Sequence, residues 1–132
     1  MGDGTELGKV RGLGSGHEGT EHWKQQRYTA LGNLFLGAWF VVSLLLLSSL
    51  DRESIGDWLA KPLPATAMIL LIVSTFYHAR LGLQVMIEDY VHDEGNKAAV
   101  LALLIMVFVA AATFGVFCVL KIALGAPGAS IL

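Results

Sequence analysis

Three long apolar stretches constrain the fold of this 132-residue chain more than any other feature. They run over about residues 30–50, 65–90 and 98–120, and each reaches the length of about 20 residues that a membrane-spanning helix needs. A spanning segment must satisfy its own backbone hydrogen bonds, which a helix does within one stretch of chain. We therefore predict an all-α membrane protein with three transmembrane helices, whose membrane domain covers residues 20–124.

Composition supports a membrane environment and excludes several other classes. The chain is 55% hydrophobic and 15% charged, with a mean hydropathy of +0.62, which is too apolar for a soluble domain of this size. Its net charge of −2 does not favour nucleic acid as a partner. The single cysteine, Cys118, lies in the third apolar stretch, so neither a disulfide framework nor a thiolate metal site is expected. Membrane lipid is the expected surrounding.

The segments outside the apolar stretches define the expected topology. Residues 1–19 form a polar, glycine-rich arm without a signal-peptide pattern, and residues 125–132 form a short tail. Gly14 to Gly19 match G-x-G-x-x-G, but no strand precedes them, so we do not read a dinucleotide site there. An odd number of spans, three, puts the two termini on opposite sides of the membrane. Basic residues outside the spans are more numerous on the N-terminal side, which favours a cytoplasmic N-terminus.

Short loops should hold the three spans as antiparallel neighbours. Residues 51–64 read as an amphipathic surface link with Trp58 at the membrane interface, and residues 91–97 read as a tight polar turn. Small residues allow close approach of helices in a membrane. The candidates are Gly32, Gly37, Ala38, Ala110, Ala111, Ala112 and Gly115.

His78 is an ionisable residue inside the second apolar stretch, where an unpartnered polar group is costly. On a helix, Gly82, Val85 and Asp89 fall within about 40° of the same face. Neutral imidazole is a common axial ligand of haem iron, and a glycine one turn away leaves room for a flat macrocycle. The alternative is a histidine that hydrogen-bonds a serine, a threonine or a backbone carbonyl of a neighbouring helix. The residues alone leave both interpretations open.

Asp89 and Tyr90 close the second stretch, about 18 Å along a helix from His78. This distance puts the histidine near mid-membrane if Tyr90 marks the rim. A phenol at the rim can donate a hydrogen bond to a quinone carbonyl, with Asp89 orienting it or passing protons. The alternative is an interfacial tyrosine beside a helix-end carboxylate.

Two arginines and three further histidines complete the set of candidates. Arg80 and Arg27 can extend toward the surface or pair with a carboxylate such as a haem propionate. The other histidines lie outside the apolar stretches and are not well placed to reach the second axial position of an iron bound to His78; they are His17, His22 and His92. A six-coordinate haem would therefore take its second histidine from another chain.

The segment His78-Ala-Arg-Leu-Gly82-Leu-Gln-Val-Met-Ile-Glu-Asp89-Tyr90-Val resembles the bacterial hydrophobic membrane-anchor subunit of succinate dehydrogenase. That family has a haem-ligand histidine, a glycine four residues on and a closing Asp-Tyr pair. Upstream, Arg27-Tyr-Thr-Ala is similar to the Arg-x-Thr-Ala step before the family's first span. The resemblance covers about residues 12–124.

The resemblance implies a subunit that is not an enzyme on its own. It implies an anchor and quinone-site subunit of succinate dehydrogenase (succinate:quinone oxidoreductase, complex II), which serves the tricarboxylic acid cycle and the respiratory chain in the bacterial inner membrane. The helical bundle would be shared with a second anchor chain, the cytochrome b556 subunit. The iron–sulfur and flavoprotein subunits would be the other partners.

Residue roles follow from the same resemblance. It implies that His78 is one axial ligand of the haem b iron and that the cytochrome b556 subunit supplies the other. It also implies that Tyr90 hydrogen-bonds ubiquinone, with Asp89 beside it, and that Arg27 lies near the haem propionates. Arg80 occupies a position that varies in the family and receives no site role.

Three other functions remain compatible with these residues. A fumarate reductase anchor would carry electrons in the opposite direction through a similar subunit. A small transporter or proton-relay subunit would use His78, Arg80 and Asp89 as an ionisable chain without haem. An assembly factor would explain the three spans but not the histidine among them.

Overall fold

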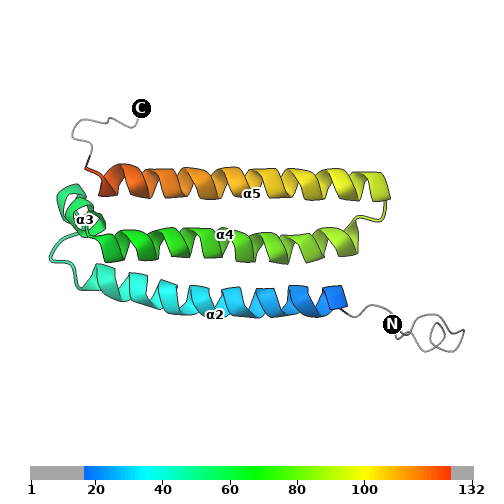
Figure 1. Ribbon diagram of the computed structural model, residues 1–132, viewed down its shortest axis with the longest axis horizontal. Coiled ribbons are helices and arrows are strands. Elements are labelled where there is room, and N and C mark those ends of the chain that lie inside the picture. The colour runs from blue at the N-terminus through cyan, green and yellow to red at the C-terminus, as the bar shows by residue number, and fades with distance from the viewer. Residues whose placement is uncertain (1–16, 126–132) are drawn as a thin grey trace, which may run out of the picture.

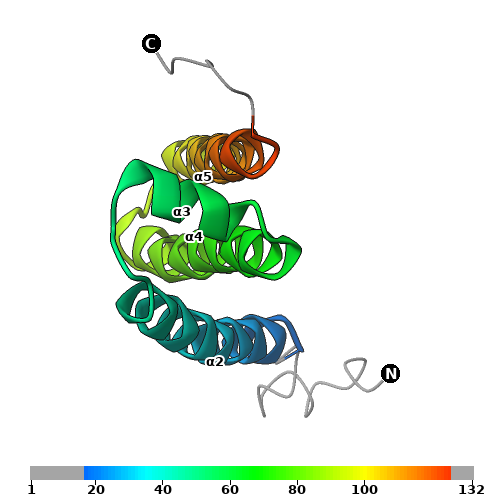
Figure 2. The same ribbon diagram turned by 90° about the vertical axis from the view of Figure 1, so that its left-hand side faces the viewer.

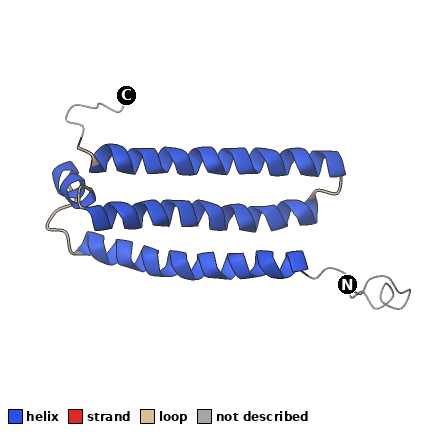
Figure 3. Ribbon diagram, viewed as in Figure 1, coloured by secondary structure: helices blue, strands red, loops and turns tan. Residues whose placement is uncertain are grey.

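The computed structural model describes residues 17–125, which form four helices without a strand (Figures 1 and 3). The three long helices lie side by side in one layer with α4 in the middle, and the short helix α3 crosses one end of the layer (Figures 1 and 2). Their bounds are α2 His17–Leu45, α3 Arg52–Leu59, α4 Pro62–Tyr90 and α5 Glu94–Ala123. The long ones are apolar enough and long enough to cross a membrane. The predicted all-α fold with three spanning helices is confirmed.

The first and last helices begin earlier than the apolar stretches suggest. α2 starts at His17, close to the predicted start of the membrane domain at residue 20, and continues into the first apolar stretch because residues 21–28 are mostly good helix formers without a proline or glycine. α5 starts at Glu94, since the Asp93 carboxylate accepts a hydrogen bond of 2.8 Å from the backbone N–H of Asn96. The predicted turn over residues 91–97 is therefore shorter than expected. Residues 1–16 of the glycine-rich arm, with the first half of its G-x-G-x-x-G match, and residues 126–132 of the tail lie outside the described residues.

Helix α3 occupies the link that the sequence suggested was a surface segment. Asp51 caps it by accepting a 2.8 Å hydrogen bond from the backbone N–H of Ser54. Trp58 is only 9% exposed, because its ring stacks on Trp39 with centroids 5.7 Å apart and also contacts Phe40 at 6.3 Å. This aromatic cluster ties the end of α2 to α3, so Trp58 packs into the bundle instead of lying on its surface.

Two of the predicted close-approach glycines lie at helix contacts. A Cβ on Gly32 would stand 3.7 Å from the Ser74 hydroxyl, and one on Gly115 would stand 3.0 Å from Cγ2 of Ile72. Gly115 therefore brings α5 directly against α4. Gly37 has nothing within 4 Å of its would-be Cβ, so its predicted role at a contact is wrong.

The layer leaves much apolar surface uncovered. α4 contacts both α2 and α5, and the view along the helices shows α2 and α5 on opposite sides of it (Figure 2). Among the described residues, only four hydrophobic side chains are buried, those of Trp58, Leu59, Leu81 and Val119. Large exposed apolar side chains cover the outer helices, as expected where lipid or other protein chains supply the contacts.

Candidate functional site

His78 lies near the middle of α4, and its half-buried side chain meets α2. Its Nδ1 atom is 2.9 Å from the hydroxyl oxygen of Thr29. The hydrogen-bonded alternative from the sequence is therefore confirmed for one ring nitrogen. The other nitrogen, Nε2, makes no hydrogen bond to any residue in the described range 17–125, so it keeps its capacity to bind another group.

An open groove of about 590 Å³ runs between α2 and α4 beside His78. Gly82, one turn after the histidine, contributes no side chain to its wall, and a Cβ there would lie 3.5 Å from Nε2 of Gln26. The predicted common face of His78, Gly82 and Val85 is confirmed, because all three line the groove. The lining is completed by His22, Trp23, Gln26, Arg27 and Ala30.

The α2 wall of the groove is polar. Arg27 holds its guanidinium 4.2 Å from the centroid of the Trp23 ring, a cation–π contact that keeps the charge at the groove. Nε2 of His22 and Oε1 of Gln26 are buried without a hydrogen-bond partner in the part of the chain that the structure describes. Buried polar atoms in folded proteins usually have a hydrogen-bond partner, which can be protein or ordered water, so these two atoms have capacity left for a bound group or water. His22 lines the same groove as His78, because α2 begins at His17 and carries the residue inside the helix. That it is not well placed to reach the second axial position of an iron bound to His78 stays a prediction.

These residues fit a haem. The groove offers two imidazole nitrogens without a hydrogen bond to another described residue, Nε2 of His78 and Nε2 of His22. It also offers Gly82, the apolar side chains of Ala30 and Val85, and the cation of Arg27. The described residues hold no cluster of three or more histidine, cysteine, aspartate or glutamate side chains that could bind a metal ion. A metal here therefore needs most of its ligands from outside this set, as haem iron does when a porphyrin supplies four nitrogens and protein side chains supply the axial ligands.

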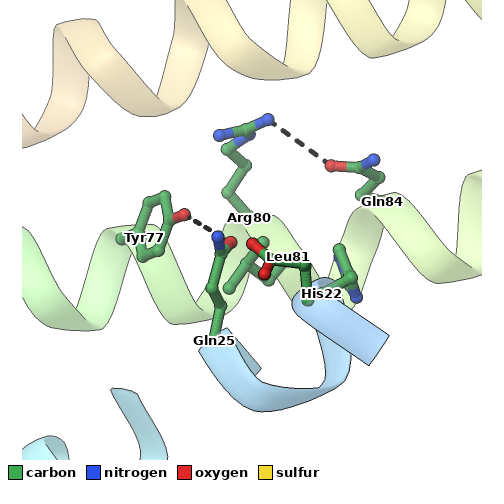
Figure 4. A pocket seen from close by; sticks show the side chains of 7 residues that line it. His22, Gln25, Tyr77, Arg80, Leu81 and Gln84 are labelled. Carbon is green, nitrogen blue, oxygen red and sulfur yellow. Dashed lines mark hydrogen bonds between the residues drawn. The ribbon is translucent and has the colours of Figure 1, made fainter. Parts of the chain in front are cut away.

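A second hollow of about 510 Å³ contains Arg80 and is shown in Figure 4. Tyr77 donates a 2.8 Å hydrogen bond to Gln25 of α2, while Arg80 donates one of 3.4 Å to Gln84 (Figure 4). Gln84 in turn donates to Glu88 at 2.8 Å, so this row of polar groups runs along α4 toward its end. Nε of Arg80 is buried without a hydrogen-bond partner among the described residues, and the two expected options for Arg80, extension toward the surface or pairing with a carboxylate, stay predictions.

The ionisable chain proposed for a proton relay is not assembled. Arg80 bonds to Gln84, whereas the bond of His78 is to Thr29. On a helix, Arg80 and His78 are about 160° apart, which puts them on nearly opposite faces. Asp89 lines neither of these two hollows.

Asp89 and Tyr90 are the last residues of α4, and both are exposed, Tyr90 at 78%. Neither side chain forms a hydrogen bond with another residue in the described part of the chain. The groove beside His78 reaches Val85 but not this pair. The structure thus brings His78 and Arg27 into the lining of one groove. Asp89 and Tyr90 lie outside it, at the end of α4 that lies beside the starts of α2 and α5 (Figure 1). The site roles of all four residues stay predictions.

The sequence analysis gave Thr29 no role, although its hydroxyl is the partner of His78. A signal was present in the Arg27-Tyr-Thr-Ala step, where one hydroxyl opens a long apolar stretch. Its contact with His78 depends on the register between α2 and α4, which periodicity within one helix does not define.

Comparison with known proteins gives a consistent result. The family model described as succinate dehydrogenase/fumarate reductase transmembrane subunit matches residues 1–117. Similar proteins named succinate dehydrogenase hydrophobic membrane anchor subunit occur in Rickettsia conorii, at 34% identity over 65% of this chain and 69% of that protein, and in Rickettsia bellii, at 33% over 65% and 69%. The protein of that name from Paracoccus denitrificans is 29% identical over 70% of this chain and 71% of its own length.

Proposed function

Since this chain belongs to the succinate dehydrogenase/fumarate reductase transmembrane subunit family, we propose that it anchors a succinate:quinone oxidoreductase in the bacterial inner membrane. Its relatives carry the name of the hydrophobic membrane anchor subunit. The chain is not an enzyme by itself under this proposal. It provides helices to a bundle shared with a cytochrome b556 subunit, and it supports an iron–sulfur and a flavoprotein subunit that oxidise succinate.

The free Nε2 of His78 beside Gly82 is the observation that carries the cofactor part of the proposal. His78 would hold the iron of haem b through Nε2, and the cytochrome b556 subunit would supply the other protein ligand. Arg27 would neutralise a haem propionate from the α2 wall. The haem, when bound, supplies one-electron redox chemistry within the membrane.

The quinone part of the proposal rests on Tyr90 and Asp89. The Tyr90 hydroxyl is exposed and has no partner among the described residues, so it is free to donate to a carbonyl of ubiquinone. Asp89 lies next to it and orients the hydroxyl or accepts a proton. Both residues sit at the α4 end beside the N-terminal end of α2 (Figure 1). We assign this end to the cytoplasmic side, where the iron–sulfur subunit binds and completes the site.

A fumarate reductase anchor is the second candidate, because the matched family includes both enzymes. The same His78 and Tyr90 would serve it with electrons moving the other way. The haem-free relay has less support, since His78 and Arg80 form separate hydrogen bonds on nearly opposite faces of α4.

The test replaces His78 in the assembled complex. His78→Ala should abolish or alter the haem b spectrum, while succinate-driven dye reduction continues because that reaction belongs to the partner subunits. His92→Ala is the matched control, since His92 lies on the loop after α4 and bonds only the backbone carbonyl of Tyr90. Assembly is checked first by co-purification of all subunits. An unchanged haem b spectrum and haem stoichiometry in the His78 variant would falsify the ligand assignment.

A further inference from the structure

Three possible hydrogen-bond partners surround the hydroxyl oxygen of Thr29. Its oxygen lies 2.8 Å from the backbone carbonyl oxygen of Gln25, 3.1 Å from that of Gln26 and 2.9 Å from Nδ1 of His78. The two carbonyl oxygens can only accept hydrogen bonds, whereas a neutral imidazole nitrogen either carries a proton and donates or is bare and accepts. The position of one proton therefore decides the state of the imidazole.

Only one arrangement places a hydrogen atom in both of the shortest contacts, the 2.8 Å contact with the Gln25 carbonyl oxygen and the 2.9 Å contact with Nδ1 of His78. If the Thr29 hydroxyl donated to Nδ1, it would face the Gln25 carbonyl oxygen at 2.8 Å without a hydrogen between the two oxygens. If it donates back to the carbonyl of its own helix, as threonines in helices commonly do, then Nδ1 must carry the proton and donate to the hydroxyl. We infer that Thr29 is a positioning residue that holds His78, which lines the groove, in the tautomer protonated on Nδ1 and bare on Nε2.

The consequence for the site rests on the proposed function of His78. Iron binds an imidazole through a nitrogen without a proton, and the hydrogen bond of the other nitrogen sets both the tautomer and the ring orientation. Thr29 thus prepares His78 for the metal before the haem arrives. Loss of such an outer partner typically weakens metal binding by about 10- to 100-fold. It also makes the imidazole a weaker electron donor, which shifts the haem midpoint potential to more positive values.

The tautomer itself is measured without haem. The full-length chain is labelled with histidine carrying ¹⁵N at Nδ1 only, placed in lipid bilayers and examined by solid-state NMR, where protonated and bare nitrogens have well-separated shifts. The His78 signal is identified by its loss in His78→Asn. We expect a protonated Nδ1 in the wild type and in Thr29→Ser, and a mixture of states in Thr29→Val. A bare Nδ1 at His78 in the wild-type chain would overturn the inference.

The effect on the haem is measured in the assembled complex by redox titration and by haem content per flavin. Thr29→Val should raise the midpoint potential and lower haem affinity, and Thr29→Ser should restore both. Thr113 supplies the matched control, because its hydroxyl makes the same backbone bond, 2.7 Å to the carbonyl of Val109, without a histidine. Equal potentials in Thr29→Val and Thr113→Val would contradict a role for Thr29. If Thr29→Val does not assemble, the wild-type nitrogen spectrum still decides.

The two proposals fail in different ways. If haem b is unchanged in His78→Ala, the assignment of His78 as a haem ligand is wrong. The protonation of Nδ1 can still be read from the nitrogen NMR spectrum of the wild-type chain. Haem b that depends on His78 while Nδ1 is bare removes only the inference about Thr29.

Discussion

Gly82→Ala is expected to have opposite effects on the fold and on haem binding. A Cβ at this position would lie 3.5 Å from Nε2 of Gln26, an ordinary van der Waals distance, so α2 and α4 can keep their packing. Alanine in a helix interior is favoured over glycine by about 0.8–1 kcal/mol. The membrane domain of the variant should therefore be at least as stable as that of the wild type.

The same methyl group would project into the groove beside His78, because Gly82 forms part of the groove wall. Forcing extra carbon into a filled site typically costs about 1–3 kcal/mol. This cost corresponds to a roughly 5- to 150-fold weaker affinity for the haem. A larger side chain, as in Gly82→Leu, should weaken binding further.

The assay titrates haem supply during expression and reads haem b per flavin from reduced-minus-oxidised spectra of the purified complex. Stability is followed in parallel as resistance of the membrane domain to unfolding by sodium dodecyl sulfate. Gly37→Ala is the control, because its added Cβ would meet nothing within 4 Å and Gly37 does not line the groove. Equal haem occupancy in the two alanine variants would refute the argument that Gly82 clears space for a flat ligand.

Two further substitutions test other parts of the chain. Tyr90→Phe should slow succinate-driven quinone reduction about fivefold, which is the equivalent of a hydrogen bond of about 1 kcal/mol, and should leave dye reduction unchanged. Tyr28→Phe is the control. Equal rates of quinone reduction in the two variants would count against a quinone site at Tyr90. At Asp51, hydrogen bonding by the Ser54 backbone and by the Ser49 hydroxyl lowers the carboxyl pKa below 3.8. The cap should therefore stabilise α3 above that value and lose its effect as pH falls through the lowered pKa. The protection factor of the Ser54 amide, which is the exchange rate of unstructured peptide at the same pH divided by the rate of this amide, should fall in acid in the wild type and stay constant in Asp51→Asn. A wild-type protection factor that does not change with pH would contradict this.

The sequence predicted the helical architecture and the face that His78 shares with Gly82, because hydropathy and the 3.6-residue period are properties of single segments. It did not predict the burial of Trp58, which depends on stacking against Trp39 of another helix. The place of His22 in the groove and the partnership of Thr29 were also missed. Both depend on the axial offset between α2 and α4. That offset follows from packing between the two helices rather than from the sequence of either helix alone.

The middle position of α4 has a consequence for how the protein is made. During synthesis α2 enters the membrane first, and both helices that it contacts through the Trp58 cluster and the groove are still to come. Its N-terminal turns carry Glu21, Lys24 and Arg27, so this helix has charged side chains near one end. Until α4 is inserted, its groove-lining residues have no facing helix. The bond between Thr29 and His78 is made only when α4 has been inserted. α2 therefore completes its contacts only after α4 has been inserted, and a chain that ends before α4 would leave the Thr29 hydroxyl and the groove-lining residues of α2 without their α4 partners.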